Sequence, residues 1–388
     1  MSLPNVNITL ANGTLGQTLQ TADGVCGMVL VGVSEGTIVQ GTPLTVISLS
    51  DAQSKGLTQT NNPIAYKEIT EFFNEAGNGA TLYLLLTANT VTVDAMADQT
   101  NANGATKLLD FAAGAIRILG IMDDPGAYTP TITNGINSKV ATAKTNMQTL
   151  ATTYFNKQWP FRAIIAGENY SGTATALTDQ TTASQNRVAI LIGDTVASTN
   201  RAAIGLLLGR LSAIPVQRKV SRVKTGPLST PAAYIVATDA AQYTTTSTIH
   251  DRGYISVRTF ANKTGYYFTG DPTCTATTDD YCFVARGRVI DKAQIIAYAT
   301  YVEEIDNEVL VNADGTLDAG YCKFMEQQII NQLSLIMKAN NEISNVLCYV
   351  DPSQNVLATN IVNVVLKIVP VGYSSTISIT LGFSDPAA

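Results

Sequence analysis

The chain has 388 residues, more than a single domain usually contains, so two domains are expected. Hydrophobic residues make up 45%, enough for large cores, whereas charged residues make up only 14%, against about 25% in typical soluble proteins. The net charge of −6, from 24 basic and 30 acidic residues, argues against a general nucleic-acid-binding protein, because such binding depends on clustered Lys and Arg. The low charge fits a chain whose faces are buried against copies of itself, and equally a Thr-rich secreted protein.

Targeting segments and paired cysteines are not expected. The first residues lack the basic and apolar stretches of a signal peptide, and no apolar run approaches the roughly 20 residues of a membrane span. The five cysteines are odd in number and show no CxxC spacing, which favours free buried thiols in a reducing cytoplasm. A pair between Cys274 and Cys282 is the less favoured alternative.

The N-terminal residues 5–11 predict a half-buried strand. Val6, Ile8 and Leu10 alternate with polar residues, so they share one face. The following polar residues contain no second alternating run that would complete a hairpin. The backbone groups of this strand must therefore be satisfied by a distant segment or by another chain.

Residues 23–240 alternate between buried strands and amphipathic helices, which indicates βαβ units and a mixed or parallel sheet. A Gly-rich turn at residues 77–79 ends the first helix, because Gly tolerates the left-handed conformation there. The expected strands are residues 24–33, 44–47, 80–86, 116–122, 161–166 and 188–192, and the expected helices are residues 66–75, 105–113, 136–155 and 197–214.

In the last third, residues 289–300 and 321–336 have apolar residues at helical spacing. Residues 362–368 alternate as a strand whose second face is also partly apolar, which predicts a sheet covered on both sides. After a connector at residues 370–375, a half-buried strand is expected at the chain end. Its apolar face comprises Ile377, Ile379, Leu381 and Phe383.

No catalytic, cofactor-binding or metal-binding residue is expected. The single histidine, His250, has no partners at motif spacing, and a packing or surface role is favoured. The paired carboxylates at residues 123–124 and 279–280 are expected to be solvated loop residues. Residues 312–318 faintly resemble a calcium loop, but the glycine comes too early and no closing Glu follows, so a turn is favoured.

The densest basic stretch is residues 218–224, with Arg218, Lys219, Arg222 and Lys224. It contains no aromatic residue, so stacking on nucleic-acid bases is not supported. An edge strand with protective charge is slightly favoured. The alternative is a contact with an acidic patch on a neighbouring subunit.

Several short motifs between residues 265 and 383 resemble, in this order, the C-terminal domain of contractile tail sheath proteins of phages and related injection systems. The helix, Gly-rich turn and strand of residues 66–86 are also similar to the N-terminal part of that family. Residues 208–215 depart from it, since the family's usual aromatic residues are missing. The motif residues are Gly265, Tyr267, Phe268, Tyr281, Arg288, Asp291, Asp351, Pro370, Gly372 and Tyr373.

This resemblance implies a structural subunit of α+β (mixed α/β) class rather than an enzyme. In the family, copies form stacked six-membered rings around an inner tube, and contraction drives the tube through a target envelope. Baseplate and tail terminator proteins are further implied partners, and no nucleic acid, membrane insertion or cofactor is implied. The implied location is a virion tail or an injection particle assembled in the bacterial cytoplasm.

The resemblance also implies a division of the chain. Residues 1–20 and 374–388 are expected to be strand arms donated to neighbouring subunits, which agrees with the partnerless strands at both ends. Residues 21–240 are expected to be an outer domain, inserted into an inner sheath domain that is built from residues 241–373 of the C-terminal third together with the extreme N-terminus. In the family an inner-domain helix contacts the tube, and the candidates here are Lys323, Gln327 and Lys338, although ordinary solvent exposure explains these residues equally well.

Three other functions stay open from the sequence. An enzyme built on the βαβ-like part needs a cleft with convergent polar groups, and no recognisable set is present. Another virion structural protein, such as a capsid or tube subunit, fits the motifs less well. A surface carbohydrate-binding protein is compatible with the low charge and high Thr content.

Overall fold

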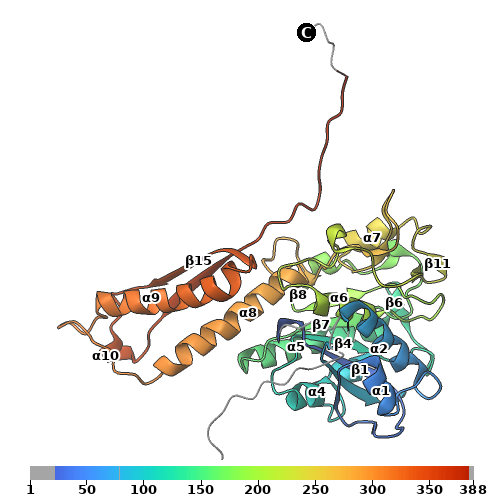
Figure 1. The fold of residues 1–388 in the computed structure, drawn as a ribbon, viewed down its shortest axis with the longest axis horizontal. Helices are drawn as coiled ribbons and strands as arrows, with labels where there is room; N and C mark the ends of the chain where they lie inside the picture. The colour runs from blue at the N-terminus through green and yellow to red at the C-terminus, as the bar shows by residue number, and fades with distance from the viewer. Residues whose placement is uncertain (1–21, 78, 384–388) are drawn as a thin grey trace, which may run out of the picture. The chain divides into compact units, whose positions relative to one another are not determined.

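The computed structural model describes residues 22–77 and 79–383 (Figure 1). The chain divides into two compact units, the first ending at Ala299 and the second beginning at Thr300. The mixed α/β class expected from the sequence is confirmed.

The first unit is built on a six-stranded sheet in the order β2-β3-β1-β4-β7-β9. Five strands run parallel, and β2 at one edge is antiparallel to β3. The central strands are buried on both faces, which explains why they read as continuous apolar runs in the sequence. The strands are β1 Cys26–Val31, β2 Leu44–Val46, β3 Leu82–Thr87, β4 Ile118–Met122, β7 Arg162–Ala166 and β9 Val188–Leu191.

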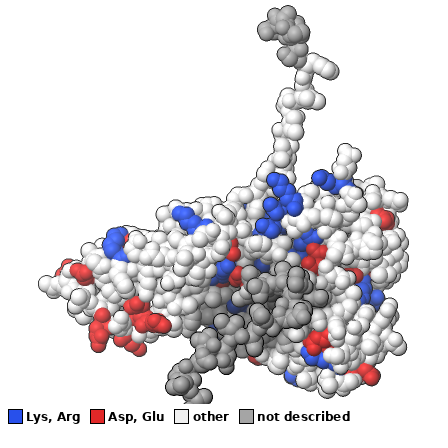
Figure 2. Space-filling view, in the orientation of Figure 1, with Lys and Arg blue, Asp and Glu red and all other residues white. Residues whose placement is uncertain are grey.

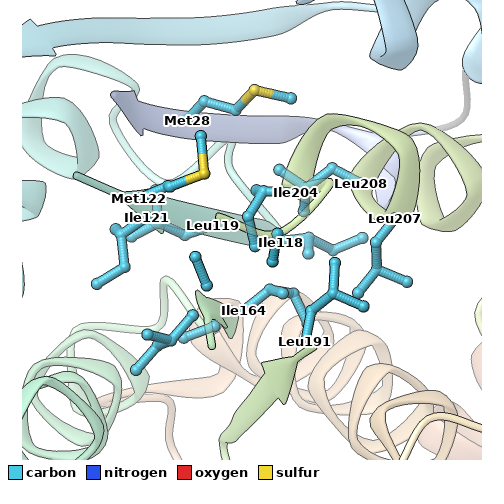
Figure 3. Close-up of a cluster of buried hydrophobic side chains, with 14 of the residues drawn as sticks. Met28, Ile118, Leu119, Ile121, Met122, Ile164, Leu191, Ile204, Leu207 and Leu208 are labelled. Carbon is cyan, nitrogen blue, oxygen red and sulfur yellow. The ribbon is translucent and has the colours of Figure 1, made fainter. Parts of the chain in front are cut away.

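Helices cover both faces of this sheet, so the unit has three layers (Figure 1). Helices α2 and α6 pack on one face, against each other and against the central strands, and α3, α4 and α5 pack on the other. Figure 3 shows the core where β1, β4 and β7 meet α6, with Met28, Ile164 and Leu208 among its side chains. The helices are α1 Leu49–Ser54, α2 Pro63–Ala76, α3 Val93–Ala97, α4 Ala105–Phe111, α5 Ser138–Asn156 and α6 Ile204–Ala213.

Two glycines allow α6 to pack unusually close to α2. A Cβ atom on Gly205 would lie 1.9 Å from the carbonyl oxygen of Glu68, and one on Gly209 would lie 2.6 Å from that of Phe72. The side chain of Glu68 then accepts a hydrogen bond from the Gly205 amide at 2.6 Å. This bond satisfies one of the free amides at the start of α6, which has no side-chain cap of its own.

The rest of the first unit consists of two-residue ladders, α7 and most of α8. In one of these ladders, β12 and β13 are joined by a loop. In another, β14 pairs with β8, which is distant in sequence. The elements are β5 Ile132–Thr133, β6 Ile136–Asn137, β8 Ser184–Gln185, β10 Tyr234–Ile235, β11 Thr238–Asp239, α7 Thr246–Asp251, β12 Val257–Arg258, β13 Tyr267–Phe268, β14 Cys274–Thr275 and α8 Val284–Tyr301.

The second unit contains a long antiparallel ladder packed against a helix. Helix α9, Ala319–Leu333, is capped by Asp318, whose carboxylate accepts from the Tyr321 amide at 3.0 Å, and it continues into a π-helical turn, Ser334–Lys338. Strands β15 and β16 pair with each other, and α9 packs against β15. The remaining elements are α10 Val356–Thr359, β15 Ile343–Val350 and β16 Val364–Pro370.

Most predicted elements are confirmed, and three expectations are wrong. Helix α6 starts at Ile204 rather than at residue 197, because Ser198 and Asn200 have φ of 59° and cannot belong to a helix. The basic stretch at residues 218–224 forms turns and the start of a 3-10 helix instead of an edge strand. The β15–β16 sheet is covered on one face only by the residues that the structure describes.

The compact units do not share the boundary expected at residue 240, since residues 241–299 lie in the first unit. The division of the chain into arms, outer domain and inner sheath domain describes an assembled particle. It therefore stays a prediction.

Candidate assembly surface

The β15–β16 sheet has a covered face and an exposed face, which follow from strand alternation. On the covered face, Val346 pairs with Ile368 and Val350 with Val364. Val350 belongs to a small core with Leu317, Cys322 and Met325, the last two from α9. Glu326 of α9 also accepts a hydrogen bond from the Val350 amide at 3.0 Å. The helix therefore fixes the position of the strand.

The exposed face of the same sheet is largely apolar. Tyr349 and Val365 lie directly opposite each other, 53% and 49% exposed, and Leu347 beside them is 54% exposed. Val369 extends the row at 40% exposure. Lys367 lies on the same face, opposite Leu347 and between Val365 and Val369, so the apolar residues are interrupted by one charge. Exposed apolar residues gathered on one sheet face are typical of a surface that another chain covers.

Both strands of this sheet are edge strands within the described part of the chain, since the sheet contains only β15 and β16. Each edge presents a row of backbone donors and acceptors that can pair with an added strand. Such edges are the acceptor sites of strand addition, in which the main chain provides the hydrogen bonds. The sheet thus offers two positions for strands from elsewhere.

After β16 the described chain runs from residue 371 to residue 383 without helix or strand (Figure 1). The predicted apolar face at its end is exposed, with Ile377 at 76%, Ile379 at 81% and Leu381 at 93%. Phe383 is fully exposed as well. These residues, named here the C-terminal arm (residues 374–383), therefore make no strand within their own chain. The N-terminal residues Val6, Ile8 and Leu10 lie outside the described residues.

The predicted tube-contact residues lie on or just after α9. Lys323 is exposed and pairs with Glu326 at 2.5 Å, and Gln327 is exposed one turn further on. Lys338 ends the π-helical turn and donates to Asn345 at 3.1 Å. All three side chains are exposed, and their contact with an inner tube stays a prediction.

Two motif residues fix α8 in the first unit. Asp291 accepts from Arg162 through both oxygens, at 2.6 and 2.8 Å, and from Arg187 at 3.1 Å. Asp291 and Arg162 are both almost fully buried. Arg288 donates to the backbone carbonyls of Asp23 and Ile214 at 3.2 and 3.3 Å.

Other motif residues also have structural roles. Tyr267 and Phe268 are buried in β13, and Gly265 with φ of 85° makes the turn before it. Asp351 accepts from the Ser353 amide at 2.9 Å in the turn after β15. The others lie at or near the surface: Tyr281 is 36% exposed, Pro370 and Gly372 are exposed, and Tyr373 is half-buried.

A buried carboxyl pair, missed by the sequence analysis, lies at the ends of two parallel strands. Asp123 directly follows β4 and Glu168 closely follows β7, and both are fully buried, so the expectation of a solvated Asp123 is wrong. Asp123 accepts from Tyr128 at 3.0 Å, Tyr128 accepts from Asn137 at 2.7 Å, and Glu168 accepts from the Asp123 amide at 3.0 Å. This ring of bonds holds the loops at that edge together.

Burial and the neighbouring Asp123 raise the pKa of Glu168 well above its usual range. The folded chain then keeps a proton that the unfolded chain releases above a pH of about 4.3. The contribution of Glu168 to stability is therefore fully present below that pH and is lost as pH rises toward the raised pKa of the folded state. Glu168→Gln mimics the protonated form, so its stability relative to wild type should be higher at pH 8 than at pH 5. Urea unfolding at pH 5 and pH 8 measures the free energy of unfolding of wild type and variant, and Glu35→Gln, at an exposed position, is the control. An unchanged pH dependence in Glu168→Gln would contradict the assignment.

No group of three His, Cys, Asp or Glu side chains within residues 22–77 and 79–383 is placed to hold a metal ion. His250 lies at the end of α7, and burial lowers its pKa, in keeping with a packing role. Cys274 and Cys282 are free and buried rather than paired. The turn expected at residues 312–318 is present, with Gly315 at φ of 81°. No described helix is both long and apolar enough to cross a bilayer.

Comparison with solved structures shows which fold this is. The helical sheath of the anti-feeding prophage in its contracted state matches with a TM-score of 0.61 at 14% identity, over 99% of both chains. The sheath complex of an extracellular contractile injection system, PVC, in its contracted state also matches with a TM-score of 0.61 at 12% identity. The match covers 100% of this chain and 99% of that one. A sheath tail protein from Desulfitobacterium hafniense matches with a TM-score of 0.50 at 12% identity, over 95% of this chain and 100% of that one. The chain therefore has the fold of sheath proteins, as the resemblance implied.

No curated protein sequence matches the chain. Family models, in contrast, match almost all of it. The model described as "DUF2586, N-terminal domain" matches residues 3–271, and the model described as "DUF2586, C-terminal domain" matches residues 280–388. The chain belongs to the DUF2586 family.

Proposed function

We propose that this chain is the structural subunit of a contractile sheath. In this proposal copies polymerise into stacked six-membered rings around an inner tube, and contraction of the polymer drives the tube through a target envelope. The observation that carries the proposal is the end-to-end match to sheath subunits, which covers 99% of both chains in the anti-feeding prophage sheath. Such a role is structural and requires no catalytic centre.

The surfaces of the second unit support self-assembly. The C-terminal arm exposes an alternating apolar row. Among the described residues, the β15–β16 sheet has two unpaired edges and a largely apolar exposed face. An arm that adds to the sheet of a neighbouring copy satisfies its own backbone and that of the edge strand in one step. Main-chain ladders of this kind would keep copies connected while their side-chain surfaces exchange partners during contraction.

Other components of the particle follow from the same proposal. A helix facing the tube presents polar groups, and Lys323, Gln327 and Lys338 of the second unit are the proposed contacts. The baseplate of the anti-feeding prophage contains a chain that matches with a TM-score of 0.63, which supports a baseplate partner. A terminator protein is the proposed partner at the opposite end. The particle is a phage tail or an injection system assembled in the bacterial cytoplasm.

The arm makes a sharp test possible, because its two faces differ. Ile379→Asp places a charge on the apolar face, which strand addition would bury, whereas Thr380→Asp places the same charge on the opposite face. We expect wild-type protein and Thr380→Asp to form hollow tubes in negative-stain electron microscopy. Ile379→Asp should raise the concentration needed for tubes at least about tenfold, since burying an unpaired charge costs several kcal/mol.

Circular dichroism is the control for folding, and all three proteins should show the same thermal transition. Deletion of residues 374–388 should likewise leave a folded monomer without tubes. Tubes that form equally well after the deletion would refute arm donation. A wild-type chain that never forms tubes, even with baseplate components added as nuclei, would refute the sheath function itself.

A further inference from the structure

Basic and acidic residues are segregated into two separate stretches of this chain. Between Asp194 and Asp239 there are basic residues and no acidic one, and between Lys292 and Lys323 there are acidic residues and no basic one. The first stretch belongs to the first unit, and every acidic residue of the second stretch belongs to the second unit. The basic residues are Arg201, Arg210, Arg218, Lys219, Arg222 and Lys224, and the acidic ones are Glu303, Glu304, Asp306, Glu308, Asp314 and Asp318.

Half of the basic residues are neutralised inside the first unit. Arg201 lies 3.4 Å from Asp124, Arg210 is paired with Glu75, and Lys219 lies 3.7 Å from Asp271. The other three are Arg218, Arg222 and Lys224, named here the basic loop. Arg222 and Lys224 are exposed, and none of the three forms an ion pair with a described residue. Three positive charges thus remain on one short surface segment.

The basic loop is held in a defined conformation. The Arg218 amide donates to Pro215 at 3.0 Å and the Arg222 amide to Lys219 at 3.2 Å. The Lys219 ammonium lies 3.4 Å from the ring centroid of Phe283, which fixes the middle of the loop. Burial and then the charge of Arg222 lower the pKa of Arg218, as expected for neighbouring like charges. The loop therefore presents its charges without a large ordering cost.

The acidic residues that directly follow α8 are the counterpart in the second unit. Glu303, Glu304, Asp306 and Glu308 are named here the acidic segment, and three of them are exposed. Glu304, the half-buried one, accepts only from neutral amides, those of Gln328 and Asn307, both at 3.2 Å. No described Lys or Arg pairs with the segment. Figure 2 shows acidic side chains gathered in the second unit where α8 ends.

We propose that the basic loop of one copy binds the acidic segment of a neighbouring copy in the assembled polymer. This contact rests on the proposed sheath function. The charges favour a second copy as the partner, because every copy carries both a basic loop and an acidic segment of opposite charge. The basic loop has no aromatic side chain on which nucleic-acid bases would stack. Complementary charges at the edge of an interface mainly orient the two partners and disfavour wrongly aligned contacts.

Exposed apolar residues in the acidic segment make the contact more than a charge pair. Ile305 is 66% exposed between the carboxylates, and Leu310 just beyond them is 79% exposed. Covering them removes apolar area from water, which contributes at any salt concentration. The charge contribution, in contrast, weakens as salt rises, since the Debye length shortens to about 3 Å at 1 M.

Charge reversal in trans tests this contact. One variant carries Arg218→Glu, Arg222→Glu and Lys224→Glu, the other carries Glu303→Lys, Asp306→Lys and Glu308→Lys, and a third combines all six changes. Lys107→Glu with Glu35→Lys is the control, because both residues are exposed and neither is in an ion pair. The readout is the protein concentration at which tubes appear in light scattering and negative-stain microscopy, at low salt.

Each single-sided variant should need at least about a tenfold higher concentration than wild type, because like charges then face each other. An equimolar mixture of the two, and the combined variant alone, should recover most of the loss. Recovery in the combined variant but not in the mixture would place the contact within one chain and overturn the proposal. Single-sided variants that assemble like the control would overturn it as well, with the sheath function intact. A wild-type chain that never assembles would refute the sheath function first.

Discussion

Gly205→Ala is expected to destabilise the first unit by about 3 kcal/mol, the largest loss foreseen for any single methyl group in the chain. The added Cβ would lie 1.9 Å from the carbonyl oxygen of Glu68, which is backbone and cannot rotate away. Relief requires α6 to move away from α2, which loosens the helix pair and lengthens the bond from the Gly205 amide to the Glu68 carboxylate. Urea unfolding followed by circular dichroism measures the loss.

Gly372→Ala is the matched control, because a Cβ there has nothing within 4 Å. It should change the free energy of unfolding by less than about 0.5 kcal/mol. The loss of free energy of unfolding in Gly209→Ala should lie between those of Gly205→Ala and Gly372→Ala, since its Cβ would lie 2.6 Å from the carbonyl oxygen of Phe72. Equal effects of Gly205→Ala and Gly372→Ala would show that the helix pair is not packed as described.

Asp291→Ala is expected to cost about 3–5 kcal/mol, because it leaves Arg162 and Arg187 without their shared carboxylate. Arg162 cannot turn toward water, since it is 1% exposed and Gly287 sits against its guanidinium. A Cβ on Gly287 would meet that group at 2.4 Å. The loss should appear as a lower urea midpoint of the first unit, with α8 released from the sheet.

Two further variants make the cause of that loss testable. Asp280→Asn removes a carboxylate from an exposed position and should be neutral within about 0.5 kcal/mol. The double variant Arg162→Met with Asp291→Leu should be less destabilised than Asp291→Ala alone, because a buried charge without its partner costs more than an apolar pair. The single variants Arg162→Met and Asp291→Leu complete the comparison. If the double variant loses as much free energy of unfolding as these two single variants added together, the ion pair is not the reason for the loss.

The sequence predicted the sheet of the first unit well because its signals are local. Strands such as β1 and β4 are continuous apolar runs bounded by turn residues, and periodicity alone identifies them. Helix α5 was equally clear. The start of α6 was not, because the left-handed residues Ser198 and Asn200 give no warning in composition.

Long-range contacts between side chains could not be predicted from spacing. Asp123 and Glu168 are 45 residues apart, and only the order of β4 and β7 in the sheet brings them together. Arg162 and Asp291 are 129 residues apart and meet for the same reason, through the placement of β7 and α8. Asp291 was singled out because it resembles a family motif, and the structure supplies its physical role as the anchor of α8.

The arm at the chain end has a consequence for how this protein can change over generations. Its apolar residues bury nothing in their own chain, so substitutions there leave the folded monomer as stable as before. In the proposed polymer, the free energy of folding and the strength of the contacts between copies would therefore be set by different residues. Natural variation can retune how readily copies join, and how firmly they hold, without passing through poorly folded intermediates.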